Sequence, residues 1–198
     1  MSSVQKLQQW LLVIVLLIPF GSAWADWELD STQSAINFIS IKNDSVGEVH
    51  SFTSLAGSIG ATGQVQIVIN LNSVETLVEV RNERMRGLLF ETVTFPAAQI
   101  TARVDPTMLA AAVDRGVITT SVPVTLALHG QEKTMTIAVV AVGEGDGSLR
   151  VFTPRPVIIN ASDFGLEKGV AALTTIAGLQ SISSAIPVTF DLQFTATP

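Results

Sequence analysis

Alternation of apolar and polar residues is the commonest pattern along this chain. Val65, Ile67 and Ile69 alternate with polar neighbours, which predicts a strand with one buried face. Glycine-rich turns separate many such segments, so consecutive strands are expected to pair antiparallel. The same reasoning predicts strands over residues 34–41, 46–52, 54–59, 97–104, 116–128, 133–142, 148–151, 156–160 and 186–194.

The period changes after Asn72. Apolar residues then recur at spacings of three, four and seven as far as Leu89, which predicts a helix inserted between two strands. Ser73 is its predicted N-cap, and Pro96 prevents the helix from continuing. Weaker helical patterns follow at 107–114 and, near the C-terminus, at 169–181.

About eight antiparallel strands joined by short turns indicate a mainly β fold, either a closed barrel or a sandwich. Periodicity alone does not separate these two architectures. In a barrel of eight strands, the interior is just wide enough to hold one small ligand.

Residues 1–25 are expected to be a secretion signal. Lys6 precedes an apolar run over 10–20, and Ala23-Trp24-Ala25 fits the small-x-small cleavage rule. The run is shorter than the ~20 residues of a transmembrane helix. The alternative is an uncleaved membrane anchor. We expect cleavage before Asp26, no permanent membrane span, and a periplasmic protein of one domain, 26–198.

The formal net charge of −6 argues against nucleic acid as a partner, since phosphate binding needs basic patches. The chain has no cysteine, so the exported fold must be held by burial and sheet pairing without disulfides. The sequence gives no indication of the oligomeric state.

No catalytic constellation is found in the sequence. His50 and His129 lack carboxylates at metal-ligand spacing, and no nucleophile elbow, HExxH motif or phosphate-binding glycine loop is present. Asp163 and Glu167 are candidates for an acid–base pair, but turn formation after a strand is the favoured interpretation of both residues. We therefore expect neither an enzyme nor a metal site, and no cofactor.

Several short motifs occur in order along the chain. They are Trp27-Glu28-Leu29-Asp30 with Ser34 and Phe38, Ser73-Val74-x-Thr76, Arg81-Asn82-x-x-Met85-Arg86, Leu89-Phe90-Glu91, Phe95-Pro96, His129-Gly130 and Asp163-Phe164-Gly165-Leu166. Together these motifs resemble the YceI-like family of periplasmic lipid-binding proteins. The chain departs from the family pattern in two places: Glu91-Thr92 follows Phe90 where the family has an aromatic residue and Asp, and an extra apolar segment lies near the C-terminus.

The resemblance implies an eight-stranded lipocalin-like barrel that holds a polyisoprenoid or quinone-like chain. Arg81 and Arg84 are candidates for contact with a lipid head group. The alternative is that Arg81, Arg84 and Arg86 pair with Glu75, Glu79 and Glu83 along the helix. A solid-cored barrel that binds a partner protein or acts as an adhesive module is the alternative function. The expected apolar lining comprises Phe38, Ile67, Ile69, Phe90, Ile100, Val124, Leu126, Phe164 and Phe190.

Overall fold

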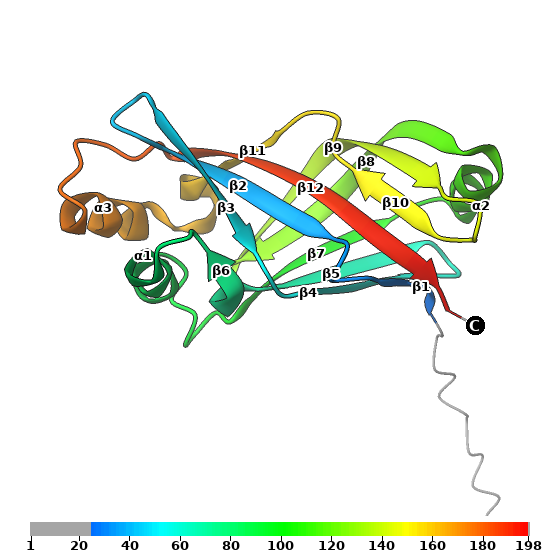
Figure 1. The fold of residues 1–198 in the computed structure, drawn as a ribbon, viewed down its shortest axis with the longest axis horizontal. Coiled ribbons are helices and arrows are strands. Elements are labelled where there is room, and N and C mark those ends of the chain that lie inside the picture. The colour runs from blue at the N-terminus through cyan, green and yellow to red at the C-terminus, as the bar shows by residue number, and fades with distance from the viewer. Residues whose placement is uncertain (1–24, 198) are drawn as a thin grey trace, which may run out of the picture.

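A computed structural model of the chain describes residues 25–197. The predicted signal therefore lies outside the described residues, except for Ala25, which begins the first strand. Eight strands form a closed antiparallel ring, confirming the predicted barrel (Figure 1). The ring closes where β12 pairs with β1. In spatial order its strands are β1 (Ala25–Leu29), β4 (Leu55–Gly60), β5 (Gln64–Asn70), β7 (Ala97–Arg103), β8 (Val117–Leu128), β9 (Gln131–Gly143), β10 (Leu149–Phe152) and β12 (Ala185–Ala196).

Four further strands lengthen the wall of the barrel. β12 pairs with β10 and then β11 along one edge, and with β1 and then β2 along the other. β3 pairs with β2, and the short β6 pairs with β3. The added strands are β2 (Ala35–Lys42), β3 (Val46–Phe52), β6 (Val74–Glu75) and β11 (Val157–Asn160).

The β8–β9 hairpin shows how local sequence sets the register of the ring. His129 and Gly130 both have positive φ, 51° and 74°, as a two-residue type I′ hairpin turn requires. Leu128 consequently pairs with Gln131, and the pairing continues without interruption to Val117 and Val142. The predicted alternation then directs one face of each strand to the interior.

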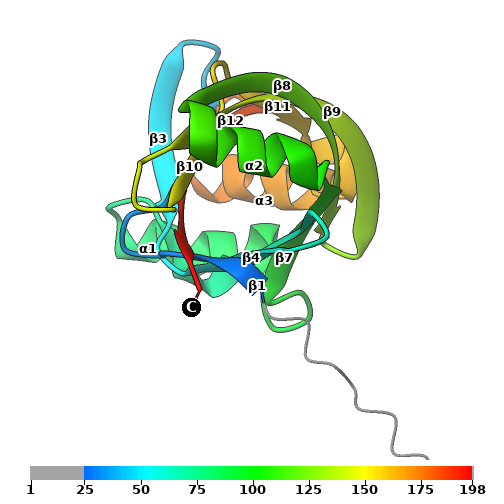
Figure 2. The ribbon, with the colours of Figure 1, turned by 90° about the vertical axis from the view of Figure 1, so that its right-hand side faces the viewer.

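Helices lie across both ends of the barrel (Figures 1 and 2). At one end lies α2 (Pro106–Arg115). Asp105 is its N-cap, since the Asp105 carboxylate accepts a hydrogen bond from the backbone N–H of Thr107. At the other end lie α1 (Glu79–Arg84), the π-helical turn η2 (Met85–Leu89) and α3 (Glu167–Ile176). Within the described residues, none of the helices has the length and apolarity needed to cross a membrane.

The predicted start of the inserted helix is wrong. Residues Leu71–Ser73 form a 3₁₀ turn, η1. The Ser73 hydroxyl donates to the Asn70 carbonyl and accepts from the backbone N–H of Ser54, so it caps no α-helix. Val74 is buried through strand pairing with Phe52, whereas Leu77 has φ 63° and is 89 % exposed. This left-handed residue delays the helix until Glu79.

Candidate ligand-binding site

The interior of the barrel is a cavity of about 650 Å³. This volume lies within the ~300–1,000 Å³ typical of small-molecule pockets. The inward faces of the strands supply its aliphatic wall, including Ile186 and Val188 from β12 and Ile137 and Val139 from β9. The barrel is therefore hollow, contrary to the alternative of a solid core.

Eight of the nine residues predicted to form the apolar lining border this cavity. They come from β2, β5, β7, β8 and β12 and from the residue that follows η2. Burial is highest for Ile67 and Ile69 on β5 and for Phe90. The eight are Phe38, Ile67, Ile69, Phe90, Ile100, Val124, Leu126 and Phe190.

Phe164 is the exception, and does not line the cavity. It lies in the 3₁₀ turn η3 (Ala161–Phe164), completely buried, and forms a separate apolar cluster with Ala161 and Leu166. Its backbone carbonyl lies 3.2 Å from Nδ1 of His129. Phe164 thus anchors the turn before α3 to the β8–β9 hairpin, a packing role that the aromatic residue type alone did not reveal.

The two ends of the cavity differ. Leu109 and Ala112 of α2 close one end with buried side chains. At the opposite end, Val80 of α1 and Ile176 of α3 also border the cavity, and each is 49 % exposed. From these exposed side chains we infer that the cavity opens between α1 and α3, and we call this opening the mouth. Exposed apolar side chains at an opening provide a path for an apolar molecule to enter.

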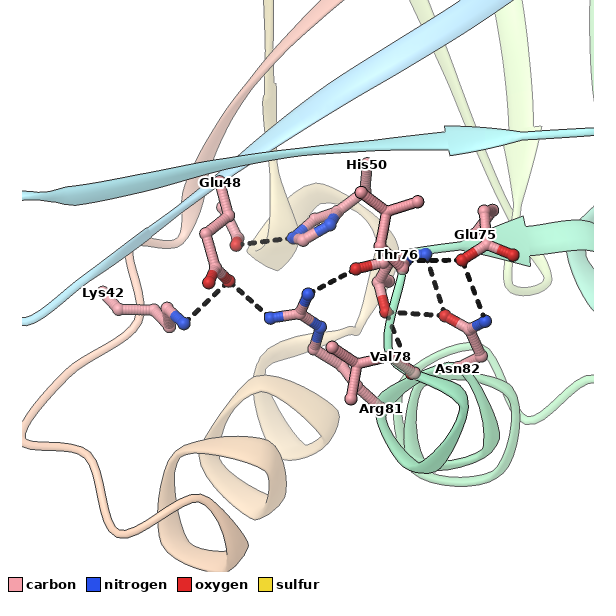
Figure 3. A network of polar contacts seen from close by, with 10 residues as sticks. Lys42, Glu48, His50, Glu75, Thr76, Val78, Arg81 and Asn82 are labelled. Atoms are coloured by element: carbon pink, nitrogen blue, oxygen red, sulfur yellow. Dashed lines mark hydrogen bonds and ion pairs between the residues drawn. The ribbon is translucent and has the colours of Figure 1, made fainter.

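Polar side chains from β2, β3 and α1 gather beside the mouth (Figure 3). Glu48 accepts from Lys42 at 2.7 Å and from Arg81 at 2.5 Å, and Arg81 also donates to the Thr76 carbonyl. The hydrogen bond from Lys42 and the charge of Arg81 lower the pKa of Glu48. Glu48 is therefore a carboxylate at neutral pH, shared by two cations.

A buried amide fixes the segment that leads into α1 (Figure 3). Asn82 Oδ1 accepts from the backbone N–H of Thr76 at 2.9 Å and from its hydroxyl at 2.6 Å. Both residues are 2 % exposed. Buried polar groups that are fully paired hold a unique geometry, so this contact positions the Thr76 carbonyl for Arg81.

The structure revises the predicted pairing of the arginines along the helix, whereas their contact with a lipid head group stays a prediction. The predicted pairing along the helix holds only for Arg86, which contacts Glu79 at 2.5 Å. Arg81 instead pairs with Glu48 of a distant strand. Arg84 is half-buried and borders the cavity, and no ion pair or hydrogen bond involves its side chain among the described residues.

Sequence reasoning missed Glu48 and His50 as residues of the site. They share a face of β3 with Phe52, and all three border the cavity. A charged residue and a histidine on the inward face of a strand are the signal that could have revealed them, because unpaired polar groups are rarely buried there.

His50 makes stability depend on pH. It is 3 % exposed, and burial together with the charge of Arg81 lowers its pKa from the ordinary value of 6.5. As the pH falls below 6.5, His50 takes up a proton in the unfolded chain before it does so in the folded protein. The free energy of unfolding present at neutral pH is therefore reduced as the pH falls. The unfolding free energy should therefore fall less steeply in His50→Gln than in wild type between about pH 7.5 and 5.5. Equal slopes in urea titrations would contradict this.

Asp163, a candidate for an acid–base pair, has a different partner in the structure. Asp163 pairs with Lys133 at 2.8 Å, so it anchors η3 to β9 and is not coupled to Glu167. Within residues 25–197, no group of three His, Cys, Asp or Glu side chains is placed to hold a metal ion.

The fold and cavity together define a hollow antiparallel barrel with an apolar interior and helices at both ends. The profile of the YceI-like domain matches residues 27–194. The chain therefore belongs to the YceI-like family, a family of binding proteins, as the sequence motifs predicted.

Comparison with solved structures supports the assignment. A polyisoprenoid binding domain from Saccharophagus degradans, implicated in plant cell wall breakdown, is 38 % identical with a TM-score of 0.84, covering 88 % of this chain and 100 % of that domain. Burkholderia cenocepacia BcnA shares the fold at 18 % identity and a TM-score of 0.66, over 84 % and 99 % of the two chains. The Campylobacter jejuni YCEI protein shares it at 16 % and 0.53, over 75 % and 84 %. Comparison with curated proteins gives no significant match.

Proposed function

We propose that this protein binds one long apolar lipid, of the polyisoprenoid or quinone-like class, inside its barrel. The observation that carries the proposal is the cavity of about 650 Å³, whose wall is predominantly apolar. The 38 % identical domain from S. degradans is a polyisoprenoid binding domain, which supports the same class of ligand for this chain. The role is binding, without catalysis.

The physical basis is the transfer of hydrocarbon out of water. Each buried CH₂ group contributes about 0.8 kcal/mol. Part of this gain offsets the loss of translational and conformational freedom of a flexible chain. The remainder still permits tight binding without hydrogen bonds, and a wall of this kind discriminates by length and bulk.

The proposed setting is the periplasm, where the protein would carry or store its lipid after export. The expected signal over residues 1–25 supports this setting. N-terminal sequencing of protein from the soluble periplasmic fraction should begin at Asp26. Membrane-bound protein that retains residues 1–25 would contradict it.

Titration of delipidated protein with geranylgeraniol, a neutral prenyl alcohol, tests the binding function. We expect saturation at one molecule per chain and a higher thermal midpoint, because a ligand that binds only the folded state stabilises it by mass action. If geranylgeraniol and every other prenyl lipid tested leave the thermal midpoint unchanged and do not bind, the lipid-binding proposal fails, and a partner-binding module becomes the better account.

A further inference from the structure

The polar residues beside the mouth are unusual for the wall of a lipid cavity. Most of the wall is aliphatic, yet one end of it carries several ionisable side chains from β2, β3 and α1 (Figure 3). We call these residues the mouth cluster: Lys42, Glu48, His50, Arg81 and Arg84.

Two buried atoms of the mouth cluster have no hydrogen-bond partner. These are Nδ1 of His50, a residue 97 % buried, and Nε of Arg81. Nε2 of His50 lies 2.8 Å from the Ser40 hydroxyl. When that hydroxyl donates to Nε2, Nδ1 carries the hydrogen and becomes a free donor. In that tautomer His50 and Arg81 each leave a buried donor unpaired. Buried donors are almost always paired in folded proteins, so these two residues of one cavity wall call for an acceptor that a ligand supplies.

The charge of the mouth cluster indicates what kind of acceptor fits. Lys42 and Arg81 share the single carboxylate of Glu48. Arg84 follows Arg81 by three residues, so the two side chains lie on neighbouring turns of the helix. Arg84 has no ionic partner among the described residues. Three cations facing one carboxylate leave an excess of positive charge in a partly desolvated site, where an anion is favoured.

We propose that the mouth cluster binds an anionic oxygen head group, a phosphate or a carboxylate, on the lipid whose chain fills the barrel. The inference rests on the proposed function, and adds the orientation of the lipid: head group at the mouth, chain directed toward α2. Nδ1 of His50 and Nε of Arg81 donate to the head-group oxygens, and the guanidinium of Arg84 supplies the unpaired charge.

The opposite end of the cavity lacks these features. Arg103 and Asp105 border it there, but both are exposed. The Asp105 carboxylate is occupied by the backbone N–H and the hydroxyl of Thr107. Apart from the two atoms of the mouth cluster, the only buried unpaired side-chain polar atom within residues 25–197 is Nε2 of His129, and His129 does not border the cavity.

The test compares three ligands with the same four-isoprene chain: geranylgeraniol, geranylgeranoic acid and geranylgeranyl phosphate. Each is titrated below its micelle concentration into delipidated wild type, Arg84→Gln, Arg84→Lys and Arg103→Gln. Arg103→Gln is the matched control, because it removes an arginine from the other end of the same cavity. Inorganic phosphate serves as the free-anion control.

We expect both anionic lipids to bind wild type at least about tenfold more tightly than the alcohol, the size of a charge-assisted hydrogen bond. Arg84→Gln should remove most of this preference, while Arg84→Lys and Arg103→Gln retain it. Inorganic phosphate alone should not bind at millimolar concentration.

Equal affinity for all three lipids in wild type would overturn the head-group site while leaving the proposed lipid binding intact. The head-group site would also be overturned if Arg84→Gln still bound the anionic lipids more tightly than the alcohol, or if Arg103→Gln lost this preference instead. Tight binding of inorganic phosphate alone would show an anion site unrelated to lipid. If none of the three lipids binds, the proposed function itself fails.

Discussion

Ile67→Asp should abolish lipid retention and lower the free energy of unfolding by about 3 kcal/mol or more. Ile67 lies on β5 opposite Ile100, is 6 % exposed, and borders the cavity. A carboxylate at this position has no cationic partner in the aliphatic wall, and it brings water to the site where the chain should lie. Urea unfolding and extraction of bound lipid from purified protein measure the two effects.

Gln66→Asp is the matched control for Ile67→Asp. It introduces the same charge one residue away on β5, where the side chain is exposed on the outer face, so stability and lipid content should stay close to wild type. If Ile67→Asp folds and retains as much lipid as Gln66→Asp, the cavity is not the binding site.

Gly169→Val should lower the free energy of unfolding by about 1–3 kcal/mol and speed the release of bound lipid. A Cβ atom at Gly169 would lie 2.6 Å from the Leu88 carbonyl oxygen and 2.8 Å from Leu89 Cα, so α3 must move away from η2. Leu89 and Leu173 on these two elements both border the cavity. Separating them opens the wall beside the mouth, which transfer of a prenyl chain to acceptor vesicles would detect.

Ala171→Val adds a similar side chain to the exposed face of the same helix. Its release rate should match that of wild type. If both variants release lipid at the same rate, the close contact at Gly169 does not govern exchange.

The strands were predictable because the alternation of apolar and polar residues is visible within each strand taken alone. On β12, Ile186, Val188 and Phe190 alternate with outward-facing neighbours, and all three face the cavity. Alternation within a strand cannot show which strands meet at closure. β12 pairs with four different strands, and its pairings with β1 and β2 join residues more than a hundred positions apart, such as Trp27 with Ala196.

The start of the helix and the mouth cluster were harder to predict, because both depend on contacts between side chains that no sequence pattern shows. Val74, Leu77 and Val78 fit a helical period, but the 3₁₀ turn and the left-handed Leu77 interrupt it. The tertiary contact of Asn82 with Thr76 fixes this backbone. Likewise, Arg81 and Glu48 meet although 33 residues separate them, whereas sequence reasoning considered only partners on the same helix.

The central claim is that the barrel encloses one apolar chain. Native mass spectrometry of the full chain, expressed with its own N-terminus and purified without detergent, tests it most directly. The account predicts one additional mass of several hundred daltons per chain, which extracts into organic solvent and is absent from Ile67→Asp but present in Gln66→Asp. A wild-type protein that carries no such mass, and takes up none from prenyl-lipid vesicles, would contradict the account.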